Sequence, residues 1–306
     1  MSRRKLSGYR GDRRLRNCNT GTISRNRGSV IALLLCAAGV LAGVPAPAAA
    51  LDVEKSAERP GPADIRLSPT GDAVWFDGFI DDEAVSVVEP VLQAGRIKTL
   101  YIRSTGGHVG AGMRLGTLVR DAGVTVNVRS YCLSSCANYV FTAARARIIN
   151  GVVLWHGGVE QKDIREVHLC GRLVSSLYGR QMGEIAADRR DAALEAWQAM
   201  RERERAFFES IGVNAYITRA GQEPVPHVAD YTYDVPSMER LGLGNITAPE
   251  GYGTPAWCER INQGAAFRRV ECLVVTEEML RYERDRIQRG EECQPDGTLK
   301  VRPAEP

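Results

Sequence analysis

The stretch KTLYIRSTGG, residues 98–107, decides the fold class of this chain. Its β-branched and aromatic residues predict a strand over 98–103, and the paired glycines that follow predict a turn. Residues 109–122 predict a helix after that turn, despite their glycines. A strand, a turn and a helix in this order are typical of α/β proteins with parallel strands.

The same alternation continues on both sides of this stretch. Toward the N-terminus, a strand is predicted over 73–76, and Asp81 or Asp82 could cap a helix that runs toward Gln93. Toward the C-terminus, we predict strands over 124–128, 151–155 and 231–233, and helices over 134–144, 186–210, 236–242 and 276–289. The charged helix within 186–210 is interpreted as a solvated helical face. The sequence therefore predicts an α/β fold with parallel pairing.

Composition excludes several classes of protein. Of the 306 residues, 44% are hydrophobic and 25% are charged, which is ordinary for a globular protein. Collagen-like, disordered and polytopic membrane proteins are excluded on that basis. The length suits one large domain or two smaller ones with ample core.

The basic residues are concentrated at the N-terminus. Residues 1–50 hold nine Lys or Arg and one acid, an apolar run from Val30 to Val44, and three alanines ending at Ala50. This order predicts a secretory signal peptide that is cleaved near Ala50. Removing these residues from totals of 40 basic and 37 acidic leaves 31 and 36, a net charge of −5. We therefore expect no nucleic-acid partner.

Export sets the expected location and domain order. The mature protein is predicted to be periplasmic or secreted; the alternative is an inner-membrane protein held by an uncleaved leader, its only expected membrane contact. The predicted organisation is a signal peptide over 1–50, a linker over 51–72, a main domain over 73–248 with a helical insertion near 180–210, and a C-terminal extension over 249–306.

Six cysteines remain after the leader, and an even number in an oxidising compartment predicts disulfides. Cys132 with Cys136 and Cys258 with Cys272 are the favoured local pairs among fifteen possible connectivities. No Cys-x-x-Cys pair is present, and His168 with Cys170 is too little for zinc, so no metal and no cofactor are expected.

The strand ends supply the parts of an acyl-transfer site. Ser134 stands where a strand enters a helix, and the N–H groups of Gly106 and Ser135 could stabilise a developing oxyanion. His156 ends a strand and is followed by glycines. Ligand sites of parallel sheets lie at such ends, so these residues are candidates for one catalytic site. Cys136 is the rival nucleophile, and for each of these residues a structural role is the alternative.

These segments resemble the Clp protease proteolytic subunit. Residues 101–107 are similar to the strand and glycine turn of that family, 132–136 to its catalytic-serine loop, 152–156 to its strand ending in histidine, and 238–243 to its closing segment. The resemblance spans roughly residues 73–248. It is closer still to exported bacterial proteins of the Clp/crotonase superfamily that carry a Cys-x-Ser-x-Cys loop.

The resemblance implies a Clp/crotonase-like spiral of ββα units and a Ser-His-Asp triad. Asp230 fits the family's acid best, and Asp234 is the rival. The chain departs from the family at Thr105, which stands in place of the turn proline, and in the insertion between His156 and Asp230. The family also assembles into rings and trimers, so a homo-oligomer is expected by resemblance.

Three functions follow from this resemblance. The first is an exported serine hydrolase, expected to be a peptidase acting on a peptide or protein. The second is a catalytically inactive, Clp-like binding or assembly protein of the cell envelope. The third, an acyl-CoA enzyme using only the oxyanion hole, is disfavoured because CoA is cytosolic. Fold analogy alone does not choose among them.

Overall fold

A computed structural model describes residues 61–171, 189–224, 229–263 and 269–304 of the chain. Contacts divide the chain into residues 1–47 and 48–306, and every described residue belongs to the second unit. The predicted signal peptide and part of the predicted insertion lie outside the described residues. Within the described part, no helix is long and apolar enough to cross a bilayer.

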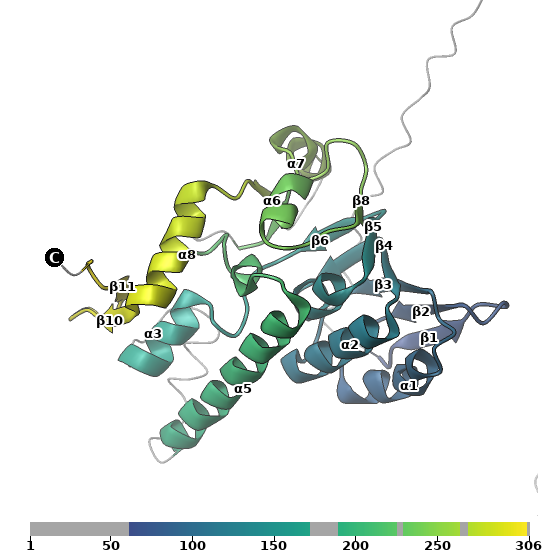
Figure 1. Cartoon of the computed structure of the whole chain (residues 1–306), viewed down its shortest axis with the longest axis horizontal. Helices are drawn as coiled ribbons and strands as arrows, with labels where there is room; N and C mark the ends of the chain where they lie inside the picture. Colours follow the sequence, from purple (N-terminus) through teal and green to yellow (C-terminus); the bar gives the residue numbers. More distant parts are fainter. Residues whose placement is uncertain (1–60, 172–188, 225–228, 264–268, 305–306) are drawn as a thin grey trace, which may run out of the picture. The chain divides into compact units, whose positions relative to one another are not determined.

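A mostly parallel sheet forms the centre of the fold (Figure 1). Its strands lie in the order β1-β2-β3-β4-β5-β8, and β6 pairs with the far end of β4. The pairing of β1 with β2 is antiparallel, and every other pairing in this sheet is parallel. The strands are β1 (Asp64–Leu67), β2 (Ala73–Asp77), β3 (Thr99–Ser104), β4 (Thr125–Leu133), β5 (Ala146–Ile149), β6 (Val152–Leu154) and β8 (Ile246–Thr247). The predicted mixed α/β architecture with parallel pairing is confirmed.

Two helices cover one face of this sheet (Figure 1). They are α1 (Asp82–Gln93) and α2 (Val109–Ala122). Asp81 caps α1 by accepting a 2.8 Å hydrogen bond from the N–H of Ala84, as its position before the apolar run predicts. Gly123, with φ of 61°, ends α2 in the left-handed conformation that glycine adopts without steric cost.

Alternation along the strands builds the core between the sheet and these helices. Residues at every second position, such as Leu100 and Ile102 of β3, are fully buried against α1 and α2. Their intervening neighbours, such as Tyr101, point to the other face and are partly exposed. This period-two pattern is what fixes the register of a half-buried strand.

Three smaller groups of elements follow the sheet. The π-helical turn η1 (Cys136–Phe141) continues directly from β4, and α3 (Lys162–Cys170), α5 (Arg190–Ile211) and the 3₁₀ turn η3 (Ala215–Thr218) come after β6. The next elements are β7 (Tyr231–Tyr233) and α6 (Val235–Arg240). The chain ends with α7 (Pro255–Asn262), β9 (Glu271–Leu273), α8 (Glu277–Arg289), β10 (Glu291–Cys293) and β11 (Leu299–Val301).

Two expectations about these elements are wrong. Residues 64–67, within the predicted linker, form β1 because they extend the sheet with an antiparallel edge strand. The helix α5 is not a uniformly solvated face: Trp197, Glu204 and Phe207 are buried against the body of the protein. Charged residues hide this buried stripe because they dominate the sequence between its apolar positions.

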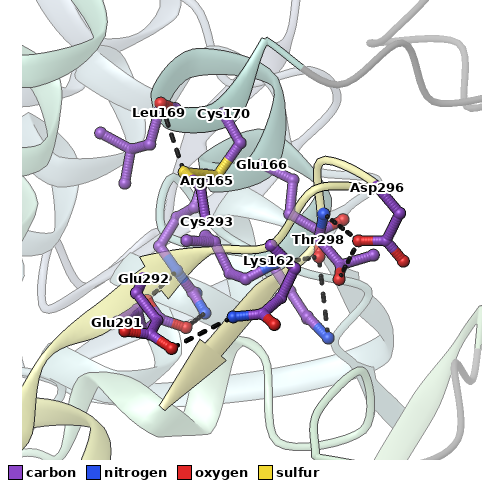
Figure 2. Close-up of a disulfide and its surroundings, with 12 residues drawn as sticks. Lys162, Arg165, Glu166, Leu169, Cys170, Glu291, Glu292, Cys293, Asp296 and Thr298 are labelled. Atoms are coloured by element: carbon purple, nitrogen blue, oxygen red, sulfur yellow. Dashed lines mark hydrogen bonds and ion pairs between the residues drawn. A yellow bond between two sulfur atoms is a disulfide. The ribbon is translucent and has the colours of Figure 1, made fainter. Parts of the chain in front are cut away.

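All six cysteines that follow residue 50 form disulfides. The predicted pairs Cys132–Cys136 and Cys258–Cys272 are confirmed. The third pair, Cys170–Cys293, joins α3 to β10 across 123 residues of sequence (Figure 2). Fully paired cysteines are compatible with the oxidising compartment expected of an exported protein.

Candidate functional site

Ser134 lies at a strained junction between β4 and the helical segment that follows it. Its φ is +54°, a left-handed conformation that is uncommon for a residue with a side chain. The Ser134 N–H donates to the carbonyl of Leu154 at 3.1 Å, and its own carbonyl accepts from Asn138 at 2.7 Å. A serine on a sharp strand-to-helix turn is the arrangement of a nucleophile elbow. We call residues 132–136 the elbow.

A disulfide closes the elbow at both of its ends. Cys132 and Cys136 are fully buried, and their Cα atoms lie 5.2 Å apart. Cys136 therefore has no thiol in this state, which leaves Ser134 as the nucleophile candidate of the elbow. Because the disulfide closes a short loop of chain around Ser134, it restricts the backbone on each side of that residue.

The glycine turn after β3 packs directly against the elbow. A Cβ atom on Gly106 would lie 2.6 Å from the carbonyl oxygen of Leu133 and 2.8 Å from the amide nitrogen of Ser135. Gly106 also has φ of +94°. Only glycine fits at this position, because both the close approach and the backbone conformation exclude a side chain. The structure thus brings Gly106, Ser134 and Ser135 together.

The hydrogen bonds of this turn change the assignment of the oxyanion donor. The N–H of Gly106 donates to Ser104 Oγ at 3.0 Å and is therefore engaged. The carbonyl of Gly107 accepts from Ser135 Oγ at 2.8 Å. In an extended residue the N–H and C=O point to the same side, so the N–H of Gly107 also faces the elbow. No described residue accepts a hydrogen bond from it, and Gly107 replaces Gly106 as the better donor.

Ser135 supplies the second donor. It is the first residue of the helical segment, where no carbonyl four residues back is in position to accept its N–H. The positive end of the helix dipole lies at the same place. The N–H groups of Ser135 and Gly107 are therefore the candidate donors to an anion at the elbow.

His156 comes two residues after the end of β6, which runs parallel to β4. Leu154 pairs with Leu133, so His156 and Ser134 follow neighbouring strands at the same edge of the sheet. Trp155 then forms an antiparallel bridge with Tyr231, through hydrogen bonds of 2.8 and 2.9 Å. Continued by one residue, this register places His156 across from Asp230.

Asp230 is better placed than Asp234 to be the acid beside the imidazole. Asp230 is 5% exposed and lies opposite His156, which is exposed. Asp234 instead caps α6, since its carboxylate accepts from the N–H of Ser237 at 2.9 Å. The insertion between His156 and Asp230 does not separate them, because the bridge at Trp155 returns the chain to β6.

Two side-chain amides hold the backbone that follows Trp155. Gln222 Nε2 donates to the carbonyl of His156 at 2.6 Å, and Asn138 Nδ2 donates to that of Gly157 at 2.9 Å. The remaining oxygens, Asn138 Oδ1 and Gln222 Oε1, are buried and accept no hydrogen bond from the described residues. Sequence reasoning did not identify either residue, because an isolated Asn or Gln gives no pattern.

Glu204 anchors α5 behind the same loop. The hydroxyl of Tyr139 donates to Glu204 Oε1 at 2.6 Å, and the N–H of Val159 donates to the same oxygen at 3.4 Å. Burial raises the pKa of Glu204 above its ordinary value, although the hydrogen bond from Tyr139 acts in the opposite direction. The carboxyl group of Glu204 therefore links α5 both to η1, which carries Tyr139, and to the loop after His156.

Downstream of the loop lies a buried set of charges, which we call the charge cluster. Its members are Glu160, Arg165, Arg219, Glu223, Glu283, Arg286 and Glu291. Arg165 is fully buried and donates to Glu223 at 2.7 Å and to Glu291 at 2.9 Å. Figure 2 shows Arg165 and Glu291 beside the disulfide of Cys170 and Cys293.

The charge cluster connects the candidate site to the C-terminal extension. Glu160 comes four residues after His156, and Arg286 of α8 contacts its carboxylate at 3.3 Å. Burial alone would raise the pKa of Glu160, but the guanidinium groups of Arg219, Arg286 and Arg201 lower it to about 2. Glu160 is therefore ionised at neutral pH, and the cluster packs α8 and β10 against the segment that carries the histidine.

Residues considered for metal binding have other partners. Cys170 is in a disulfide, and the ring of His168 stacks on Trp197 with centroids 4.7 Å apart. In the described part of the chain, no group of three or more His, Cys, Asp or Glu side chains could hold a metal ion.

Comparison with known proteins gave one kind of match. No protein-family model and no curated protein matches the chain. Among solved structures, a mutant of ClpP1 from Listeria monocytogenes is similar over 59% of this chain and 94% of its own, with 18% identity and a TM-score of 0.38. The mostly parallel sheet is consistent with this similarity.

Proposed function

We propose that this chain is an exported serine hydrolase that cleaves peptide bonds. The observation that carries the proposal is the elbow: Ser134, at φ of +54°, lies against Gly106 and beside two N–H donors, and His156 follows the neighbouring strand across from Asp230. Strained backbone at a serine persists where surrounding structure imposes it, and such positions cluster at functional sites.

In this proposal, the hydroxyl of Ser134 attacks the carbonyl carbon of the substrate while His156 accepts the hydroxyl proton. The N–H groups of Ser135 and Gly107 stabilise the oxyanion that forms. The imidazolium then gives its proton to the leaving amine, and an acyl-enzyme remains. Water, deprotonated by the same imidazole, releases the acid and restores the serine. Asp230 holds the imidazole in the required orientation.

The test is the Ser134→Ala variant of the mature protein, assayed with a serine-directed fluorophosphonate probe and with mixed-sequence quenched peptides. We expect labelling to disappear and peptide cleavage to fall by about three orders of magnitude or more. Ser86→Ala is the matched control, since Ser86 is an exposed serine on α1 whose hydroxyl donates to the carbonyl of Asp82 at 2.7 Å and accepts from Arg114 at 3.5 Å. Circular dichroism checks that both variants fold.

Two results would overturn the proposal. One is equal labelling of the parent and of Ser134→Ala. The other is a folded parent protein that is neither labelled nor able to cleave any peptide mixture, which would favour the inactive envelope binding protein. Export is tested separately: N-terminal sequencing of the protein from the periplasm should begin near Leu51.

A further inference from the structure

A groove of about 370 Å³ is lined by residues of α2 and α5. Its apolar floor is formed by Met113 and Phe207, which are largely buried. Arg114 and Arg203 stand at its sides. Each helix lines the groove with residues spaced three and four apart, which is the spacing of one helical face.

The two helices run in the same direction along the groove. At one end, Arg120 donates to Ser210 Oγ at 2.6 Å. Nearer the middle, a Cβ on Gly116 would lie 3.0 Å from Phe207. Arg203 is one turn of α5 before Phe207 and therefore lies toward the N-terminal end of α2.

That end of the groove is the end of α2 that directly follows the glycine turn. Gly110, the first groove residue on α2, comes three residues after Gly107. A Cβ on Gly112 would lie 3.0 Å from the Cβ of Ser135, so the first turn of α2 packs on the elbow. A substrate whose carbonyl occupies the oxyanion position would pass over the N-terminal end of α2 to reach the groove.

Arg203 is the cation of this groove that has no carboxylate partner in the described part of the chain. Arg114 pairs with Glu89, and Arg120 pairs with Asp121 at 2.7 Å. On α5, Arg205 pairs with Glu202. Arg203 is exposed at the groove, and its guanidinium is available to an incoming carboxylate.

We infer that the α2–α5 groove is a substrate subsite that binds an acidic side chain through Arg203. The inference rests on the proposed hydrolase function and names its substrate class: an extended peptide with Glu or Asp near the cleaved bond. The seven residue steps from Gly110 to Thr117 span roughly 10 Å at 1.5 Å per residue, about the length of three extended residues. The acidic residue is therefore expected within about three positions of that bond.

The experiment uses quenched peptides that differ only by Glu or Gln at one position, with that position moved stepwise along the peptide. The parent should cleave the Glu peptide about three to five times faster in kcat/KM at the preferred position, as for an exposed charge pair. Arg203→Gln should remove this preference and Arg203→Glu should shift it toward Lys. Arg205→Gln, on the same helix but outside the groove, should keep it.

Peptide binding by the Ser134→Ala variant tests the proposed subsite separately from the proposed hydrolase function. Fluorescence anisotropy with labelled Glu and Gln peptides should show the same preference, which 0.5 M salt should weaken. If peptides are cleaved and Arg203→Gln retains the Glu preference, the subsite is wrong and the hydrolase stands. If no peptide is cleaved but Glu-dependent binding requires Arg203, the subsite stands and the proposed function is wrong. Equal binding of both peptides overturns the subsite.

Discussion

The elbow ends at Cys136 and the charge cluster begins 24 residues later at Glu160, and the two regions are built in opposite ways. In the elbow, Ser134 has strained backbone, and the nearby Asn138 Oδ1 is buried without a donor among the described residues. In the charge cluster, Arg165 is fully buried, and the carboxylates of Glu223 and Glu291 accept its hydrogen bonds. The elbow leaves interactions to be made by another molecule, whereas the cluster pairs its charges within the chain, including Arg219 Nε, which lies 2.8 Å from a Glu223 oxygen without the geometry of a hydrogen bond.

This difference separates groups that can react from groups that hold the fold. A buried arginine is stable only when paired carboxylates compensate the loss of water, so the geometry of such a cluster serves folding. Unsatisfied donors and a left-handed serine cost stability and are retained where a ligand or reaction needs them. The two disulfides beside these regions allow the contrast to be tested.

The largest expected effect concerns the disulfide beside the charge cluster. Replacing Cys170 and Cys293 together by Ser opens a loop whose ends are 123 residues apart, which should lower the free energy of unfolding by about 5 kcal/mol. Thermal denaturation followed by circular dichroism measures the loss. A change below about 1 kcal/mol would show that the cluster holds the C-terminal extension without the disulfide.

The second largest effect is expected at acid pH, which should weaken the charge cluster. The pKa of Glu160 is lowered from 4.5 to about 2 in the folded protein, so folding favours its ionised form. Its contribution, on the order of 3 kcal/mol, is complete above the unfolded pKa and is lost as pH falls from about 4.5 toward 2. Urea denaturation at several pH values should show this slope, and Glu160→Gln should flatten it. An equally steep slope in the variant would assign the acid sensitivity to other carboxylates.

The disulfide of the elbow should affect catalytic activity more than it affects stability. Replacing Cys132 and Cys136 by Ser opens a loop with a sequence separation of only 4, so the loss of stability should be about 2 kcal/mol. Peptide cleavage should fall more than about tenfold, because Ser134 and the Ser135 N–H lose their fixed geometry. Comparing kcat/KM with the unfolding free energy for both double variants checks the contrast. Full activity in this variant would show that η1 positions the serine without the disulfide.

The smallest effect is a gain in stability. Ser134→Gly removes the side chain from a residue at φ of +54°, so the variant should be more stable by about 1 kcal/mol while losing activity. Gly in place of Ser86, within α1, is the control and should destabilise by a similar amount. If Ser134→Gly is less stable than the parent, the strain argument for the elbow fails.

Much of the fold was accessible to sequence reasoning because its determinants are local. The helix predicted over 109–122 and the Asp81 cap are confirmed, and so are the two disulfides between nearby cysteines. Residues 146–149, 162–170 and 255–262 were not predicted as β5, α3 and α7. These segments are short or strongly charged, and packing against the rest of the chain stabilises them more than intrinsic propensity does.

The candidate site was accessible only in part. The sequence pointed to Ser134, Ser135, His156 and Asp230 from strand ends and from resemblance, and their catalytic roles remain proposals. The engagement of Gly106 by Ser104, and with it the choice of Gly107 as donor, depends on hydrogen bonds that no spacing encodes. The hydrogen bonds that the side-chain amides of Asn138 and Gln222 donate to the backbone are likewise not encoded by any spacing in the sequence.

By itself, the sequence determined the alternation of strands and helices and the parallel α/β class, since period-two and helical patterns are properties of neighbouring residues. It also determined the glycine requirement of the turn at 106–107. Only the tertiary structure decided that Cys170 meets Cys293, that Asp230 lies across from His156, and that Arg203 faces a groove without a carboxylate partner among the described residues. Those relations join distant segments, and their free energy comes from burial and pairing that exist only once the chain has folded.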